Sequence, residues 1–501
     1  MLVDDAVYLG TSNRPEYLTL SFGNRHGLIT GATGTGKTVT MQILAEGFSR
    51  AGVPVFCADI KGDVAGVAAP GEPKDFLAAR AETIGLTDYA FEGYPTVFWD
   101  LFGRQGHPVR TTISEMGPLL LSRILELNAT QEGVLNAAFK YADDEGLLLL
   151  DLKDLRALLT HLAENRANLS ARYGNITTAT IGAIQRALLV IEQQGGEGFF
   201  GERALEISDL MRRDAQGRGY ISILAADELM RAPRLYAIFL LWMLSELFEQ
   251  LPEVGNPDKP TLVFFFEEAH LLFNEAPKVL IEKIEQVVKL VRSKGVGVYF
   301  VTQNPMDVPE AVLAQLGNRV QHALRAYTPR EQRAVRAAAD SFRPNPEFST
   351  AEVITQLGTG EALVSVLEEK GAPSMVGRTL IRPPSSRMGP LTPDERTRVI
   401  ATSPVAGKYD TVYDRESAYE VLERRAHDAL REAALAAREA ELRKREDALS
   451  RAQTGGAAAP RRSSSRQTPL EAAGMTVVRT FARQVGNSLV RGILGSLTKG
   501  R

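Results

Sequence analysis

The chain has 501 residues, of which 44% are hydrophobic and 24% are charged, and its formal net charge is −3. This length supports several domains with a sizeable core, while the small net charge excludes a globally basic surface, so that any nucleic-acid-binding surface must be local. The single cysteine, Cys57, excludes an intrachain disulfide framework and favours a reducing compartment, so we predict a cytoplasmic protein. No stretch reaches the roughly 18 apolar residues of a membrane-spanning helix, and no stable transmembrane insertion is expected.

Residues 1–108 are predicted to hold short strands followed by the first half of an α/β core. From residue 27, an apolar strand, a glycine-rich loop and a long helix follow one another, and the nearly all-apolar strand "VPVFCADI" comes next. Strands that alternate with helices and are apolar throughout are typical of a parallel sheet covered on both faces. We therefore predict a mostly parallel sheet with helices on both faces.

The middle of the chain is predicted to interrupt this core and then complete it. Residues 109–200 contain consecutive helical patterns, which predict an α-helical insertion that lies beside the sheet rather than extending it. Residues 201–390 form the second half of the core, with strand patterns at 219–226, 261–268 and 296–304. Near 358–382 the alternation of apolar and polar residues predicts an antiparallel hairpin at a sheet edge.

Three segments follow the core. Residues 391–453 are predicted to form a charged helical extension, in which leucines recur seven residues apart at positions 435, 442 and 449. So few heptads favour a solvated helix over a coiled coil. Residues 454–469 have the composition of a flexible linker, and residues 470–501 form a basic amphipathic segment. That segment is compatible with an anionic membrane, with DNA, with a partner protein, or with docking across a subunit interface.

The glycine-rich loop, "GATGTGKT" at residues 31–38, matches the pattern G-x-x-x-x-G-K-[ST]. Its glycines allow successive backbone N–H groups to converge on phosphate oxygens, and the following helix adds its positive N-terminal end. Lys37 is expected to reach the β- and γ-phosphates and the Thr38 hydroxyl to ligate Mg²⁺. A simple turn is the alternative, but the position between strand and helix favours a nucleotide. The predicted nucleotide-binding residues are Gly31, Ala32, Thr33, Gly34, Thr35, Gly36, Lys37, Thr38 and Val39.

An acidic pair, Glu267 and Glu268, ends the apolar strand "TLVFFFEE". We expect Glu267 to hold Mg²⁺, directly or through water, and Glu268 to polarise the attacking water as a general base. An exposed helix start with two acids is the alternative, and the apolar strand before them makes it a poor one. Aspartate is usual at the first position of such an acidic pair. Because the side chain of Glu267 is longer by one methylene group, we expect slower turnover or a shifted metal preference.

Polar residues also follow two other predicted strands. Gln303, in "VYFVTQN", is placed to contact the γ-phosphate or the lytic water as a sensor, with a polar strand end as the alternative. Asp59 and Asp63, in "ADIKGD", either support the Mg²⁺ shell, act in coupling, or belong to a simple turn.

Charge that develops on the γ-phosphate calls for a mobile cation, often an arginine from a neighbouring subunit. Arg292, Arg319 and Arg325 are the candidates, and each has a surface charge as its alternative explanation. Arg292, on the helix before the sensor strand, is the preferred contact in trans.

Together these residues resemble the HerA-FtsK superfamily of hexameric translocases, and most closely the HerA-like group typified by the bacterial YjgR proteins. The resemblance rests on the blocks "NRHGLITGATGTGKT", "ADIKGDVAG", "FFFEEAHLLF" and "VTQNPMDVPEAVLAQLGNRVQHALRA", and on the glycine-rich basic C-terminus. It implies a RecA-like P-loop NTPase core, ATP with Mg²⁺, a homo-oligomeric ring that is commonly a hexamer, and DNA in the centre of the ring. It also assigns roles to six residues: Lys37 and Thr38 in the phosphate loop, Glu267 and Glu268 on the acidic strand, Gln303 as sensor and Arg292 as the inter-subunit finger.

From the motifs and the resemblance we predict an ATP-hydrolysing, ring-forming DNA translocase or helicase. A membrane- or protein-directed coupling ATPase is one alternative, for which residues 470–501 are the motivation, and a nuclease or a membrane-associated protein is a candidate partner. A nucleotide-gated scaffold with little turnover is the other alternative, motivated by Glu267. Small GTPases and ABC ATPases are disfavoured because the motifs N-K-x-D and L-S-G-G-Q are absent from the sequence.

Overall fold

The computed structural model of the chain describes residues 2–3, 5–274 and 278–454. The chain divides into two compact units, residues 1–426 and residues 427–501. The predicted linker at 454–469, apart from its first residue, and the predicted basic segment at 470–501 lie outside the described residues.

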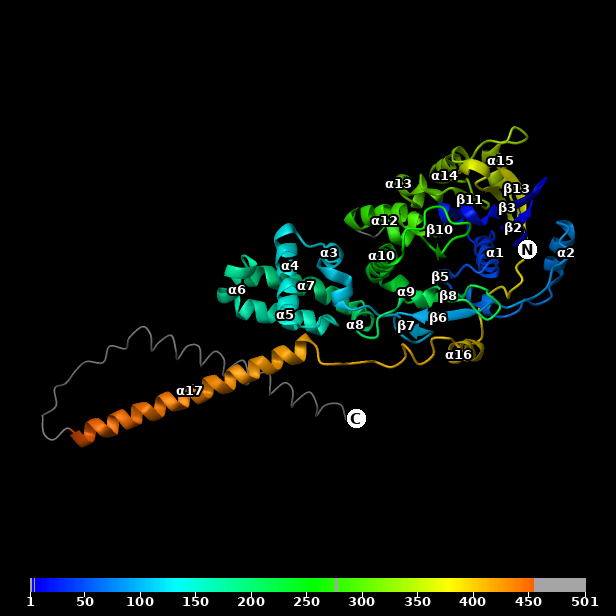
Figure 1. Ribbon diagram of the computed structural model, residues 1–501. Helices are drawn as coiled ribbons and strands as arrows, with labels where there is room; N and C mark the ends of the chain where they lie inside the picture. The colour runs from blue at the N-terminus through cyan, green and yellow to red at the C-terminus, as the bar shows by residue number, and fades with distance from the viewer. Residues whose placement is uncertain (1, 4, 275–277, 455–501) are drawn as a thin grey trace. The chain divides into compact units, whose positions relative to one another are not determined.

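One mixed sheet forms the centre of the first unit (Figure 1). Its described strands are β1 (Leu2–Val3), β2 (Ala6–Thr11), β3 (Pro15–Thr19), β4 (Gly27–Thr30), β5 (Val55–Asp59), β6 (Thr96–Asp100), β7 (His107–Pro108), β8 (Ile221–Ala225), β9 (Leu262–Phe266), β10 (Val296–Thr302), β11 (Asn318–Gln321), β12 (Glu361–Ser365) and β13 (Gly377–Ile381). Their order is β1-β2-β13-β12-β11-β4-β10-β9-β5-β8-β6-β7, and β3 pairs with β2 outside this path. The run from β11 to β7 is parallel. The predicted mostly parallel α/β core is therefore confirmed.

Helices surround this sheet and continue beyond it. They are α1 (Lys37–Arg50), α2 (Asp75–Thr83), α3 (Ile113–Ile124), α4 (Ala129–Glu145), α5 (Leu152–Glu164), α6 (Arg166–Tyr173), α7 (Thr178–Gln193), α8 (Gly196–Phe199), α9 (Ile207–Leu210), α10 (Pro233–Gln250), α11 (His270–Asn274), α12 (Lys278–Val291), α13 (Glu310–Leu313), α14 (Pro329–Asp340), α15 (Thr350–Gln356), α16 (Pro393–Ala401) and α17 (Ala418–Thr454). Within the described ranges, no helix combines the length and the apolar character needed to cross a bilayer.

The aromatic run of β9 shows why the sheet is buried on both faces. Phe264 lies 5.1 Å, between ring centroids, from Phe56 of β5, which in turn lies 6.2 Å from Phe239 of α10. Phe265 points to the opposite face, where its ring lies 6.5 Å from that of Phe48 in α1. Because successive side chains of a strand alternate between faces, an uninterrupted apolar run requires a helical layer on each side.

The segment from α3 to α7 forms a group of helices in Figure 1. Thr112, Asn128 and Asp151 begin α3, α4 and α5, and each accepts a hydrogen bond from the backbone N–H three residues later in a capping box. The buried leucines of this segment belong to the same hydrophobic core as α10 and α12, and α3 contacts both helices. The helices therefore pack on the helical layer of the sheet and add no strand to it.

The hairpin predicted near residues 358–382 is present, but it does not lie at the sheet edge. β12 and β13 pair antiparallel, as expected, and β13 pairs on its other side with β2. The edge is formed instead by the N-terminal strands, because β1 and β3 both pair with β2.

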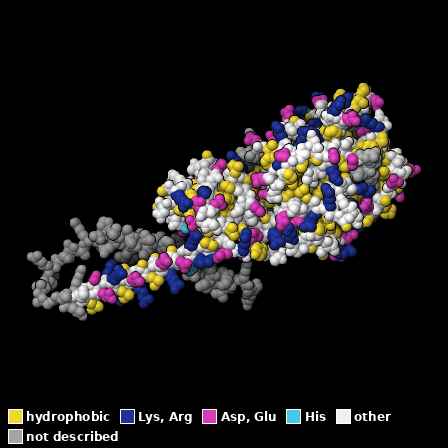
Figure 2. All heavy atoms as spheres, in the orientation of Figure 1, with side chains coloured by type: hydrophobic (Ala, Val, Ile, Leu, Met, Phe, Trp, Pro, Cys, Tyr) yellow, Lys and Arg dark blue, Asp and Glu magenta, His cyan; other side chains and the backbone are white. Residues whose placement is uncertain are grey.

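The helix α17 carries charges of both signs along its length. Figure 2 shows Lys, Arg, Asp and Glu side chains interspersed along it. Leu435, Leu442 and Leu449 are exposed.

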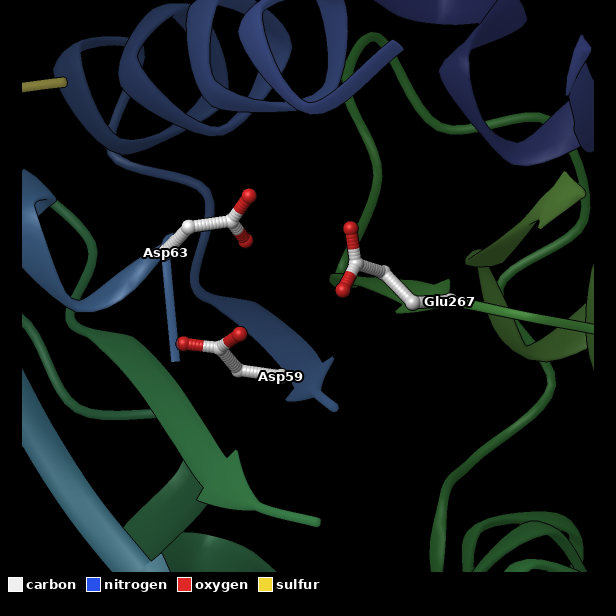
Figure 3. Close-up of side chains that lie close together, drawn as sticks. All are labelled: Asp59, Asp63 and Glu267. Carbon is white, nitrogen blue, oxygen red and sulfur yellow. The ribbon is translucent and has the colours of Figure 1, made fainter. Parts of the chain in front are cut away.

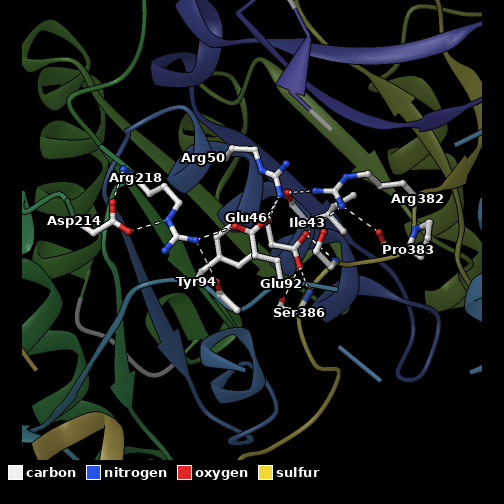
Figure 4. Close-up of polar contacts among 12 residues, drawn as sticks. Ile43, Glu46, Arg50, Glu92, Tyr94, Asp214, Arg218, Arg382, Pro383 and Ser386 are labelled. Carbon is white, nitrogen blue, oxygen red and sulfur yellow. Dashed lines mark hydrogen bonds and ion pairs between the residues drawn. The ribbon is translucent and has the colours of Figure 1, made fainter. Parts of the chain in front are cut away.

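A buried ion pair connects α1 to the segment that follows β13 (Figure 4). Glu46 and Arg382 both have fully buried side chains, and Arg382 Nη1 lies 3.1 Å from Glu46 Oε2. Ser386 donates from its backbone N–H and its hydroxyl to Glu46 Oε1, at 2.9 and 2.6 Å. Arg382 also donates to the carbonyl oxygens of Tyr8 and Ile43, at 3.0 and 2.9 Å. The pair thus joins β2, α1 and the chain after β13 at one point.

We expect Glu46→Gln to lower the free energy of unfolding by about 3–5 kcal/mol, because it leaves the Arg382 charge buried without its partner. Denaturant titration followed by circular dichroism measures this change. Glu441→Gln is the matched control, because its ion pair with Arg445 on α17 is exposed and should have little effect. Equal stabilities of the two variants would contradict a structural role for the buried pair.

Candidate active site

The phosphate loop connects β4 to α1 and folds closely around a lysine. Gly31 and Gly36 have φ angles of 152° and 116°, which side-chain-bearing residues rarely adopt. A Cβ atom at position 31 would lie 2.5 Å from the Cβ atom of His322, so only glycine at this position lets the loop pass beside His322. Lys37 is the first residue of α1, is 8% exposed, and donates from Nζ to the carbonyl oxygens of Gly31 and Ala32 at 2.7 and 3.1 Å. The loop therefore presents the start of a helix and a buried ammonium group together.

The parallel register brings the other predicted groups to the carboxyl ends of the central strands, where the phosphate loop also lies. β10 lies between β4 and β9, and Thr302 pairs with Thr30. Ala58 of β5 pairs with Phe266 of β9. The next residues along the four strands therefore lie side by side where the strands end. They are Gly31, Gln303, Asp59 and Glu267.

The charge environment of Lys37 includes the acidic strand. Burial lowers the pKa of Lys37, and the nearby carboxylates of Glu268, Glu267 and Asp63 oppose this shift. The structure thus brings together the ammonium group and the acidic pair that the sequence placed in one site.

Glu268 is surrounded by three polar side chains. Lys61 Nζ lies 2.6 Å from Glu268 Oε1, Gln303 Nε2 lies 3.3 Å from Oε2, and His270 Nδ1 lies 3.2 Å from Oε2. Burial acts to raise the pKa of Glu268, but the hydrogen bond and charge of Lys61 bring it below its usual value. Glu268 is therefore a carboxylate that is ionised at neutral pH, and such a group can accept a proton.

The backbone at Glu268 is also unusual. Its φ angle is 48°, in the left-handed region that residues other than glycine seldom occupy. The chain turns sharply after β9, and Ala269 N–H then bonds to the carbonyl oxygen of Val301 in β10 at 3.1 Å. This turn places the Glu268 side chain beside Gln303.

Glu267 lies in a different environment from its neighbour. It is 3% exposed, and burial, with the charges of Asp59 and Asp63, raises its pKa to about 8. Burial and the charge of Asp63 likewise raise the pKa of Asp59 to about 6. Oxygen atoms of these three carboxylates lie within 4.8 Å of one another (Figure 3). Thr38, the other predicted Mg²⁺ ligand, is the second residue of α1 and is half-buried.

The candidate arginines have different positions. Arg292 is exposed and precedes the start of β10. It therefore lies at the amino ends of the central strands, whereas the phosphate loop of its own subunit lies at their carboxyl ends. Its predicted contact in trans stays a prediction. Arg325 is exposed after β11. The guanidinium group of Arg319 is engaged within the subunit, where it donates to the carbonyl oxygens of Leu316, Ser341 and Leu313.

Three residues near the site were not singled out from the sequence. Lys61 and His270 lie inside the blocks "ADIKGD" and "FFFEEAH". Their positions close to acidic residues in the sequence could have indicated that they belong to the site. His322 is buried beside the phosphate loop, where Nε2 lies 2.8 Å from Thr40 Oγ1 and Nδ1 lies 2.9 Å from the carbonyl oxygen of Glu361. Burial lowers the pKa of His322 to about 4, so the ring is neutral when it supports the loop.

The comparisons with known proteins agree with this geometry. The family model described as "Helicase HerA-like C-terminal" matches residues 5–501. The structure is similar to the plasmid coupling protein TrwB in complex with an ATP analogue, ADPNP, with a TM-score of 0.52, 15% identity, and coverage of 78% of this chain and 93% of that chain. It is also similar to TrwB in complex with ADP and Mg²⁺, with a TM-score of 0.50, 16% identity, and coverage of 77% and 93%. These similarities show a RecA-like P-loop ATPase fold.

One curated protein matches over a short region. "Probable helicase MJECL08" of Methanocaldococcus jannaschii is 30% identical over 125 residues, which make up 24% of this chain and 22% of that protein. The match thus spans about a fifth of the length of this relative.

The neutral state of His322 predicts a loss of stability in mild acid. The unfolded histidine takes up a proton below a pKa of about 6.5, whereas the folded one does so only near 4, so the free energy of unfolding falls as the pH drops through this window. Between pH 7 and pH 5 the contribution of His322 is about 2 kcal/mol. Denaturant titrations at both pH values should show a smaller decrease for His322→Gln than for the wild type. Parallel pH profiles would exclude this role.

Proposed function

Because the chain belongs to the Helicase HerA-like C-terminal family, we propose that it is an ATP-hydrolysing motor that forms a ring and translocates or unwinds DNA. The observation that carries the proposal is the meeting of Lys37, Glu268 and Gln303 at one edge of the sheet. An ammonium group, an ionised carboxylate and an amide are among the groups that enzymes of phosphoryl transfer bring together around the phosphates and the attacking water.

The phosphate loop fits a nucleoside triphosphate. The N–H groups of the first turn of α1 have no partners within the helix and are oriented toward the loop, as in known phosphate sites. Residues 31–39 would hold the phosphates of ATP, and Thr38 and Glu267 would hold its Mg²⁺. Bound ATP with Mg²⁺ supplies the phosphoryl group that is transferred. The complexes of TrwB with ADPNP and with ADP and Mg²⁺ support this choice of ligands.

The residues around Glu268 suit a general base and a sensor. Glu268 would accept a proton from the attacking water, and the adjacent Lys61 keeps the carboxylate ionised until then. The amide of Gln303, which reaches Glu268 at 3.3 Å, is placed to exchange this contact for one with phosphate. Such an exchange would report the state of the nucleotide.

The arginine finger would come from a neighbouring subunit. Arg292 lies far from the phosphate loop of its own chain, at the other edge of the sheet. In a head-to-tail ring, opposite surfaces of adjacent subunits meet, so that a residue at one surface can complete the site at the other. The hexamer, the finger and the cytoplasmic location stay predictions.

A row of exposed arginines on α14 supports DNA as the substrate. Arg330, Arg333 and Arg336 are exposed on this helix, which also carries Glu331 and Asp340, and no ion pair of the three arginines is found among the described residues. Tyr327, which is 84% exposed, precedes the helix and could stack on a base. Exposed arginines without acidic partners bind the phosphates of nucleic acids in a manner that weakens with salt. The relative named a probable helicase is consistent with this choice.

A coupling ATPase directed at a protein or a membrane is the second candidate. The similarity of fold to the plasmid coupling protein TrwB favours it, and a nuclease or membrane-associated partner belongs to the same proposal. The two candidates, and a scaffold with little turnover, differ in how ATP hydrolysis responds to DNA and to loss of the base.

We expect Glu268→Gln to lower the rate of ATP hydrolysis by about 100-fold or more while ATP still binds, because only the proton acceptor is lost. Phosphate release and binding of a fluorescent ATP analogue measure the two effects separately, and Lys37→Ala should lose binding as well. Added single- or double-stranded DNA at low salt should stimulate the wild type.

Two results would redirect the proposal. Hydrolysis by the wild type that is indifferent to both forms of DNA would favour the coupling ATPase. Rates near background in both the wild type and Glu268→Gln would favour the scaffold.

The surface on α14 gives a separate prediction. Replacing Arg330, Arg333 and Arg336 together by Gln should weaken DNA binding and reduce the slope of log affinity against log salt by about 2–3, because about three phosphate contacts are lost. Fluorescence anisotropy with a labelled duplex at several salt concentrations measures the slope. The control replaces three exposed arginines of α17, Arg431, Arg438 and Arg443, by Gln. Equal slopes in both triple variants would rule out α14 as the DNA-binding surface.

A further inference from the structure

Three carboxylates gather beside the phosphate loop. Asp59 ends β5, Asp63 lies four residues later in the following loop, and Glu267 follows β9. Figure 3 shows that Asp63 and Glu267 point toward one another from different elements, with Asp59 next to both. One oxygen atom from each residue lies within 4.8 Å of the other two.

The fold holds this arrangement in place. The pairing of Ala58 with Phe266 sets Asp59 and Glu267 side by side at the ends of adjacent parallel strands. Asp59 accepts hydrogen bonds from the backbone N–H groups of Gly62 and Val64, at 2.8 and 3.2 Å. These bonds fold the loop back, and the residue between the two donors, Asp63, is thereby directed toward Glu267.

Two oxygen atoms in the cluster have unsatisfied hydrogen-bonding capacity. Glu267 Oε2 and Asp63 Oδ1 are buried and have no hydrogen-bond partner among the described residues, and the whole of Glu267 is only 3% exposed. Lys61, the nearby cation, makes its 2.6 Å contact with Glu268 instead. A buried carboxylate oxygen without a partner is costly, and carboxylates are preferred ligands of hard divalent cations.

We propose that Asp59, Asp63 and Glu267 form a divalent-cation site that fills in the absence of nucleotide. This ion shares Glu267 with the Mg²⁺ expected on Thr38 and the phosphates, so the inference deepens the proposed function and rests on it at that residue, but the ion needs neither the Thr38 hydroxyl nor ATP.

The cluster is compact enough for a single ion. Two ligands on opposite sides of an ion lie up to twice the metal–oxygen distance apart, about 4.2 Å for Mg²⁺ and about 4.6–5.2 Å for Ca²⁺, and ligands on adjacent sides lie closer together. Oxygen atoms that all lie within 4.8 Å of one another are therefore compatible with either ion.

Calorimetric titration of the full chain tests the proposal, after treatment with a chelator and without nucleotide. CaCl₂ and MgCl₂ are titrated separately into the wild type and into Asp63→Asn. We expect one ion per chain in the wild type, and at least tenfold weaker binding of both ions in Asp63→Asn. Thr38→Ala should bind the ions like the wild type. Asp414→Asn, at an exposed acid, is the matched control and should do the same.

A second measurement guards against misfolding of the variant. Ca²⁺ should raise the melting temperature of the wild type and of Thr38→Ala but not that of Asp63→Asn, because only a folded chain with the site gains stability from the ion. If Asp63→Asn melts well below the wild type without metal, Glu267→Gln takes its place in both measurements.

Three results would overturn the proposal: no binding without nucleotide, equal affinities in Asp63→Asn and the wild type, or loss of binding in Thr38→Ala. Failure of the proposed ATPase is a different outcome, because a chain that binds the ion but does not hydrolyse ATP retains this site.

Discussion

The parallel pairing of β4, β10, β9 and β5 is the constraint on which the site depends. Parallel strands end at the same edge of a sheet, so groups that are far apart in the sequence leave these strands together. Phe264 and Phe265 pack against helical layers on opposite faces of the sheet and hold β9 in place between its neighbours. A shift by one residue would exchange these faces. The same apolar contacts that stabilise the core therefore determine which polar side chains meet.

The phosphate loop rests on a support that is built from distant parts of the chain. His322 contacts Thr40 in the first turn of α1, close to the loop. Two turns further along, the pair of Glu46 and Arg382 joins the same helix to β2 and to the chain after β13. The start of α1 is thus held at two points along its length. A ligand that binds to a loop of this kind loses little free energy in ordering it.

Local patterns in the sequence were sufficient for the fold class and for the order of its motifs. The phosphate loop, the acidic pair and Gln303 each follow an apolar strand, which a short window reveals. Contacts between distant segments were not visible in this way. The pairing of β13 with β2 removes the hairpin from the sheet edge, and Lys61, after β5, acquires its role only by reaching Glu268 after the adjacent strand β9. For Asp59 and Asp63, a metal shell, a coupling role and a turn all stayed open, because their spacing does not reveal that the backbone N–H groups of Gly62 and Val64 fold the loop back.

The left-handed backbone at Glu268 has an evolutionary consequence. A side chain in this conformation costs about 1–2 kcal/mol, and glycine alone would avoid that cost. Selection for thermal robustness alone would thus favour glycine at a position where the proposed reaction needs a carboxylate. If Glu268 acts as the proposed base, the turn after β9 trades stability for reactivity, and variants selected only for heat tolerance would tend to lose the acid there.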